Sequence, residues 1–263
     1  MPLVDLNQKF PALAKPPIVE AMITFVARAR TEWTPESVTK RIVDALPDYS
    51  THLNMNQARF SFALQAGGPA GAPPPANSAV AEAENIGWMG LRLVSQDQRQ
   101  VVTAARDNLS LSWLGEYVGW TRLSSEMMRL WEIHRVIAGV DSIDQIQIRY
   151  VNRLEVPGQD FDPAIYFAGF GSPPEGLARG PFLHQDTLGH SAFPWHMLNL
   201  IRTFEPLTTA SPNLPILVVL EAANAEPIPA ENSIITERLI EMHWLKNYSF
   251  FKCVTDAYLD LCR

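Results

Sequence analysis

The sequence predicts an α+β protein built on one large, curved antiparallel sheet with helices on one face. Two patterns support this class: several segments alternate apolar and polar residues with period two, and two longer segments repeat apolar residues at helical spacing. With 263 residues, of which 47% are hydrophobic and 19% charged, the chain is long enough to bury a substantial core without disulfides.

Residues 1–140 are predicted to form a first β-α-β-β-β-α unit. It opens with a strand at 18–30, where alternate residues leave one polar face, and Thr34-Pro35 then begins a short helix that ends at Pro47. A long helix is expected at 121–138. Further strands are expected at about 53–65, 86–95, 99–106 and 109–114, and residues 67–84, rich in proline, alanine and glycine, are interpreted as a surface loop.

Residues 141–263 repeat this order and add a C-terminal helix. Asp162-Pro163 mirrors Thr34-Pro35, which indicates duplicated β-α-β(3–4)-α units that share one continuous sheet. The strands are expected at 146–156 and at about 181–190, 195–204 and 214–223, and the helices at about 230–247 and at 249–262, the latter capped by Ser249.

Composition and missing signals exclude several classes of protein. Lysine and arginine number 21 against 28 acidic residues, so the net charge of -7 disfavours nucleic acid and anionic membranes as partners. No apolar run approaches the roughly 20 residues of a membrane helix, and the N-terminus lacks the order of a signal peptide. The sequence therefore predicts a cytoplasmic protein without a membrane partner, with Cys253 and Cys262 as reduced packing residues.

Catalytic signatures are also missing from the sequence. It contains no nucleophile elbow, phosphate-binding loop, dinucleotide fingerprint, zinc-peptidase motif or C-x-x-C pair, and no cofactor is predicted. Glu237 and Glu241, four apart on a helix, are interpreted as exposed glutamates rather than an acid and base pair. His134, on an apolar helix stripe, is interpreted as a core or boundary residue with one hydrogen bond.

One histidine-rich strand is the weak candidate for a metal site. His184 and Asp186 lie about 7 Å apart on one strand face, whereas His190 lies about 20 Å from His184, so only His190 and His196 form a further pair across a hairpin. The alternative is a half-exposed strand whose polar side chains face solvent. We expect no metal.

The predicted polar face of the sheet is the main candidate for binding. Arg28, Arg92, Arg149 and Arg153 are expected on it, where they would either bind an anion, a nucleic-acid backbone or an acidic protein segment, or pair with Glu20 and Glu155. A second candidate is the aromatic group Trp113, Tyr117 and Trp120, assigned to a loop region before the long helix.

The strand at 146–156 also has two candidate structural residues. Tyr150 and Asn152 fall on its apolar face. Because a buried amide needs partners, Asn152 is expected to bond to a neighbouring loop or helix end.

Two motifs carry a resemblance that extends over nearly the whole chain: Arg149-Tyr150-Val151-Asn152-Arg153, and Pro16-Pro17-Ile18-Val19-Glu20. The chain resembles a sporadically distributed family of uncharacterised bacterial proteins. The resemblance implies no activity, cofactor or catalytic residue. The patchy distribution of the family implies an accessory role, such as phage defence or toxin neutralisation.

Together these observations favour a non-enzymatic binding or regulatory protein whose partner is another protein. Two alternatives remain open at this point. One is an enzyme of the hydrolase type built around His184 and Asp186, and the other is a protein that binds nucleic acid on its sheet face. The sequence leaves the oligomeric state open.

Overall fold

The computed structural model describes residues 4–64, 79–158, 161–170, 182–205 and 213–263. It confirms the predicted class, an α+β fold with a large, curved antiparallel sheet. Nine strands lie in this sheet in the order β2-β3-β4-β5-β1-β7-β10-β9-β8. Their bounds are β1 Ile18–Val26, β2 Thr51–Leu64, β3 Ala79–Val94, β4 Gln100–Ala105, β5 Asn108–Leu114, β7 Gln145–Pro157, β8 Leu183–His190, β9 Phe193–Phe204 and β10 Asn213–Asn224.

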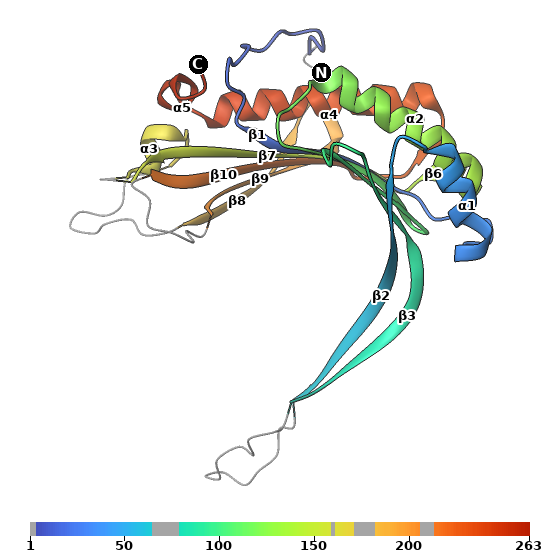
Figure 1. The fold of residues 1–263 in the computed structure, drawn as a ribbon. Helices are drawn as coiled ribbons and strands as arrows, with labels where there is room; N and C mark the ends of the chain where they lie inside the picture. Colours follow the sequence, from blue (N-terminus) through green and yellow to red (C-terminus); the bar gives the residue numbers. More distant parts are fainter. Residues whose placement is uncertain (1–3, 65–78, 159–160, 171–181, 206–212) are drawn as a thin grey trace, which may run out of the picture.

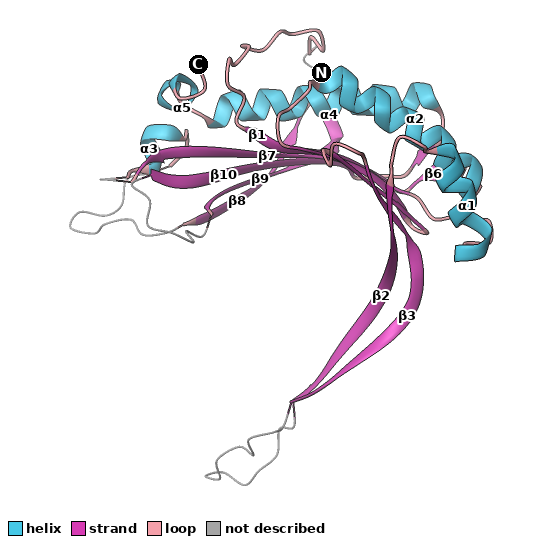
Figure 2. Cartoon of the chain, viewed as in Figure 1, coloured by secondary structure: helices cyan, strands magenta, loops and turns pink. Residues whose placement is uncertain are grey.

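The helices lie along the convex face of the sheet, and its concave face carries none among the described residues (Figures 1 and 2). A small second sheet pairs β6 with β11. The bounds of the remaining elements are α1 Pro35–Ala45, α2 Trp120–Ala138, β6 Ser142–Ile143, α3 Pro163–Tyr166, β11 Ile228–Pro229, α4 Asn232–Cys253 and α5 Asp256–Asp260.

The two predicted units meet at the centre of the sheet. Strands β1 to β5 come from residues 1–140 and strands β7 to β10 from residues 141–263, and β1 pairs antiparallel with β7 where the two sets join. Both halves therefore contribute to one continuous sheet. The division into two duplicated units stays a prediction.

The core fills the space between the sheet and the helices. Along β1, Ala21, Ile23 and Phe25 are fully buried, whereas Met22 and Thr24 are only half-buried, as the period-two pattern predicts. Phe25 meets Trp131 of α2 edge-on, with 5.3 Å between ring centroids. The apolar stripe of α2 and that of α4 are buried in the same way, so burial of apolar side chains holds both helices on the sheet.

Both predicted cap motifs begin helices. The Thr34 side chain accepts a hydrogen bond from the Ser37 amide, and the Ser37 hydroxyl oxygen accepts one from the Thr34 amide, so the first turn of α1 is capped in both directions. The Asp162 carboxylate accepts from the Ala164 amide at the start of α3.

Three predicted boundaries are wrong. The first strand, expected over 18–30, ends at Val26. Residues 67–84 were expected to form a loop, but β3 begins at Ala79; residues 65–78 lie outside the described part. At the C-terminus, α4 continues through Ser249 to Cys253, and a short α5 follows. Apolar contacts along α4 continue past Ser249, so the serine lies inside the helix rather than at its start. Both cysteines are buried and unbonded to each other, as expected.

Candidate functional site

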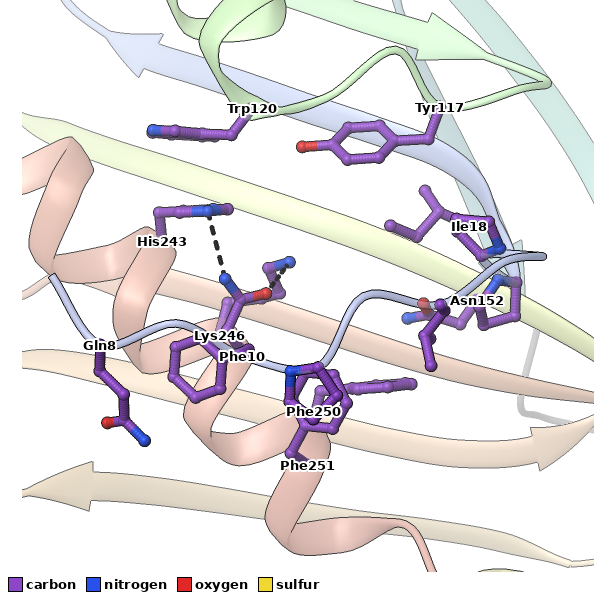
Figure 3. A pocket seen from close by; sticks show the side chains of 15 residues that line it. Gln8, Phe10, Ile18, Tyr117, Trp120, Asn152, His243, Lys246, Phe250 and Phe251 are labelled. Carbon is purple, nitrogen blue, oxygen red and sulfur yellow. Dashed lines mark hydrogen bonds between the residues drawn. The ribbon is translucent and has the colours of Figure 1, made fainter. Parts of the chain in front are cut away.

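A cavity of about 380 Å³ lies beneath the N-terminal segment on the helix-covered side of the sheet (Figure 3). Its walls come from the N-terminal segment, the start of β1, the start of α2, the middle of β7 and the C-terminal half of α4. Most of the lining is aromatic or aliphatic, with a few polar groups, which is the composition of small-molecule sites. The residues that line it are Gln8, Phe10, Pro11, Leu13, Pro16, Pro17, Ile18, Tyr117, Trp120, Asn152, His243, Lys246, Asn247, Phe250 and Phe251.

The N-terminal segment is held over α4 by a small number of contacts. The Phe10 ring stacks on Phe251 with 5.6 Å between centroids, and the Lys15 amide donates to the Cys262 carbonyl at 2.9 Å. Just before the start of β1, in the middle of the sheet, the Pro17 carbonyl accepts from the Arg153 amide of β7. Pro16 and Pro17 restrict the backbone of this segment, so they help to fix its path across the cavity.

Lys246 supplies the buried cation of the cavity. Only 6% of this residue is exposed, and its amine lies 3.9 Å from the centroid of the Tyr150 ring. The amine donates to the Asn247 amide oxygen at 2.6 Å. Among the described residues no carboxylate forms an ion pair with it. Burial without a counter-charge disfavours the ammonium form, and the pKa of Lys246 is lowered from 10.5 to about 7.

Two tyrosine hydroxyls meet beside this amine. The hydroxyls of Tyr117 and Tyr150 lie 3.1 Å apart, and their rings pack edge-on. Burial raises the pKa of Tyr117 to about 12 and that of Tyr150 well above its ordinary value. Both phenols are therefore neutral at physiological pH. One hydroxyl donates its proton to the other, which leaves the pair one proton to donate to a ligand.

Trp120 and His243 form another wall. Their rings are stacked, as Figure 3 shows, and the ring centroids are 4.3 Å apart. Burial, with a smaller contribution from the charge of Lys246, lowers the pKa of His243 to about 3. The imidazole is therefore neutral at physiological pH, and its Nε2 accepts a hydrogen bond from the Asn247 amide at 3.2 Å.

Asn152 is buried on the apolar face of β7, as predicted, but its partner differs from the prediction. Its amide donates to the Val218 carbonyl at 3.0 Å, so the partner is the adjacent strand β10 rather than a loop or helix end. In the pairing of β1 with β7, Asn152 lies opposite Ile18. The register of this pairing shifts between Ile18 and Glu20. Asn152 and Ile18 both line the cavity.

The structure brings together four of the residues singled out in the sequence, and it separates Trp113 from the other two members of the aromatic group. Tyr117, Trp120, Tyr150 and Asn152 all lie in or beside the cavity. Trp113 is not part of a loop: it lies in β5, is 2% exposed, and its ring is covered by the Arg122 guanidinium at 4.9 Å. Trp113 borders a different cavity, between β5 and α2.

Sequence reasoning missed Lys246, His243 and the N-terminal wall. A signal for Lys246 was present, because it lies four residues after Met242 on the buried stripe of α4. A lysine in such a position has either an acidic partner or a special environment. For Phe10 no local signal exists, since its contact with α4 joins distant parts of the chain.

The four arginines lie away from this cavity. Tyr150 faces α4, so its neighbour Arg149 faces the concave side, where it lies opposite Met22 and Glu221 on the adjacent strands. Arg153 forms ion pairs with Glu205 at 2.5 Å and with Glu155 at 3.1 Å. For this arginine, pairing with neighbouring glutamates is therefore the alternative that the structure favours.

The other three arginines form no ion pair with a described residue. Arg28, which follows the end of β1, and Arg92 are exposed, and Arg149 is half-buried.

His184 and Asp186 do converge, on an arginine. Their side chains lie 3.3 Å apart, and the buried Arg202 guanidinium donates to both, at 2.7 and 2.6 Å. A metal ion at this position would have to displace the guanidinium. Within the described ranges no group of three or more potential metal ligands occurs.

The remaining histidines of this region make other contacts. His190 packs edge-on against Trp244 and Tyr248, whereas His196 is buried and hydrogen-bonds to Glu241 at 2.8 Å. The two imidazoles therefore have separate partners rather than forming the pair considered from the sequence.

Glu241 was predicted to be an exposed glutamate of the helix, and this prediction was wrong. Glu241 is 4% exposed, and its carboxylate accepts from His196, Trp195 and Arg238. Burial raises its pKa, but these hydrogen bonds outweigh burial and lower it overall.

His134 is a core residue, as expected. Its ring nitrogens, however, have no hydrogen-bond partner among the described residues, and burial lowers its pKa to about 4.

No described helix is both long and apolar enough to cross a membrane. The chain matches no protein-family model, and no curated protein matches it.

Proposed function

We propose that the protein is a non-enzymatic binding protein, and that its cavity holds a small apolar molecule with one carboxylate. The observation that carries this proposal is the buried amine of Lys246, which has no acidic partner among the described residues. An uncompensated ammonium inside a protein is costly, and a bound carboxylate would supply the missing counter-charge.

The rest of the lining suits the remainder of such a ligand. Phe10, Trp120 and Phe251 offer apolar surface to the body of the molecule, and burial of that surface would supply most of the affinity. The Tyr117 hydroxyl has a proton to donate to the second carboxylate oxygen. Binding would return the amine to its charged form, so it would take up a proton near neutral pH.

Isothermal titration calorimetry with benzoate, phenylacetate and hexanoate tests the proposal, with benzamide as the neutral analogue of benzoate. We expect binding of at least one carboxylate, weaker binding of benzamide, and an affinity about 10 to 100 times lower after Lys246→Met, as loss of a charged hydrogen bond implies. Lys252→Met, which removes an exposed lysine of the same helix, should bind as the wild type does. Failure of all three carboxylates to bind, or equal binding by Lys246→Met, would overturn the proposal.

A second candidate function is capture of another protein on the concave face of the sheet. Arg92 and Arg149 favour it, because both lie on this face and neither is ion-paired with a described residue. The partner we propose is an acidic segment of another protein in the bacterial cytoplasm, in an accessory system of the kind that the family resemblance implies. The net charge of -7 weighs against nucleic acid.

Fluorescence polarisation with a labelled polyglutamate peptide tests this second candidate. The double variant Arg92→Glu/Arg149→Glu should lose binding, whereas Arg41→Glu, on the exposed side of α1, should retain it. Absence of peptide binding by the wild type contradicts the candidate, and tighter binding of a single-stranded oligonucleotide would assign the face to nucleic acid instead.

A further inference from the structure

The amine of Lys246 has a second chemical capability, because its surroundings favour the form with a free lone pair. It is buried in the wall of an open cavity, and its contacts among the described residues are the Asn247 oxygen and the face of the Tyr150 ring. Neither contact is an anion that would hold the amine protonated. A desolvated lysine in an apolar pocket is a nucleophile toward carbonyl carbon.

We propose that Lys246 captures small aldehydes with apolar bodies as an imine inside this cavity. The inference rests on the proposed use of the cavity as a ligand site, but it assigns a different chemical class of ligand. The lysine nitrogen attacks the carbonyl carbon and gives a carbinolamine. Loss of one water molecule, which carries away the carbonyl oxygen and both amine hydrogens, then leaves the carbon–nitrogen double bond. No oxidant or reductant is required.

The groups around the amine are suited to this reaction. Facing it are His243 from its own helix, Tyr150 from β7 and Tyr117 from the segment before α2, all of them neutral at physiological pH. One phenol proton lies in the hydrogen bond between the two hydroxyls, and the other can be donated to the departing oxygen. The N-terminal segment adds Gln8, Phe10 and prolines to the lining rather than a charge.

The cavity should make Lys246 far more reactive than the other lysines. Those four, Lys9, Lys15, Lys40 and Lys252, are exposed to solvent. With a pKa of about 7, half of the Lys246 amines are neutral at neutral pH. For an ordinary exposed lysine the neutral fraction at that pH is about one in 2,500. The difference predicts selective labelling, on the order of 1,000-fold per site, provided that the aldehyde enters the cavity.

Reductive trapping tests the inference on the intact protein. Wild-type protein would be incubated with benzaldehyde and sodium cyanoborohydride at neutral pH, and the benzylated lysines identified by peptide mass spectrometry. We expect one dominant adduct, on Lys246, with the exposed lysines nearly unmodified. Lys246→Arg should lose this adduct, whereas Lys252→Arg should keep it. Equal labelling of the exposed lysines, or no adduct on Lys246, would overturn the inference.

A competition experiment separates this inference from the proposed function and needs no variant. If benzoate binds in the cavity and slows benzylation of Lys246, both hold. If benzoate binds but no adduct forms on Lys246, covalent capture fails and the proposed function stands. If the adduct forms while no carboxylate binds, the carboxylate proposal fails and the inference that Lys246 captures aldehydes stands.

Discussion

Replacement of Lys246 by methionine should remove a pH dependence from the stability of the protein. In the unfolded chain the amine titrates near 10.5, whereas in the folded protein its pKa is about 7. Between these values the unfolded chain binds more protons, so the contribution of this residue to the free energy of unfolding rises as pH rises. Below pH 7 the amine is charged in both the folded and the unfolded protein. The folded state then bears the full free-energy cost of burying the ammonium.

The size of the effect follows from the shift. One pH unit inside this window is worth about 1.4 kcal/mol, so the contribution changes by about 4 kcal/mol between pH 7 and pH 10. Methionine has a similar shape and no charge, so Lys246→Met should gain stability over the wild type, most strongly at the low end of the window.

Urea unfolding followed by tryptophan fluorescence measures this change at pH 7, 8, 9 and 10. The quantity compared is the difference in free energy of unfolding between wild type and variant, in which other titrating groups cancel. Lys252→Met, on the same helix but exposed, should show a constant difference. If the difference for Lys246→Met stays constant within about 1 kcal/mol over this range, the claim that the Lys246 amine is buried without a counter-charge is refuted.

Three further substitutions test other parts of the structure by the same unfolding assay. Glu241→Gln should cost about 3 to 5 kcal/mol at neutral pH. Because the folded pKa of Glu241 is lowered, this difference should shrink as pH falls below about 4, and a difference unchanged by pH would contradict the buried carboxylate. Asn152→Ala should cost about 1 to 3 kcal/mol, since the hydrogen bond to Val218 is lost, and an unchanged midpoint would show that this bond contributes nothing. Gly90→Ala should cost about 1 to 3 kcal/mol because its Cβ would lie 2.1 Å from the Ala104 carbonyl oxygen, and wild-type stability would mean that the two strands are not so close.

The strands and their polar faces could be predicted from sequence because their signal is local. Alternation in β1 and β7 follows from the pleat of a single strand, and it placed Tyr150 and Asn152 on the buried face and Arg149 on the other. The order of strands in the sheet was out of reach, because it depends on which distant strands pair.

The candidate site was only partly predictable for the same reason. Tyr117 and Trp120 stood out by composition, but their neighbour in sequence, Trp113, belongs to the core. Exposure of an aromatic residue is decided by the elements that pack on it, which a local pattern does not reveal. Lys246 has a local signal, its position on the buried stripe of α4, but the N-terminal wall of its cavity comes from a distant part of the chain that no local pattern places there.

The most direct test of the central claim is a crystal structure of the protein soaked with benzoate. We predict that a carboxylate oxygen lies about 2.8 Å from the Lys246 amine, with the aromatic ring against Phe10, Trp120 or Phe251. A benzoate bound elsewhere with this cavity vacant, or one whose carboxylate points away from Lys246, would contradict the account.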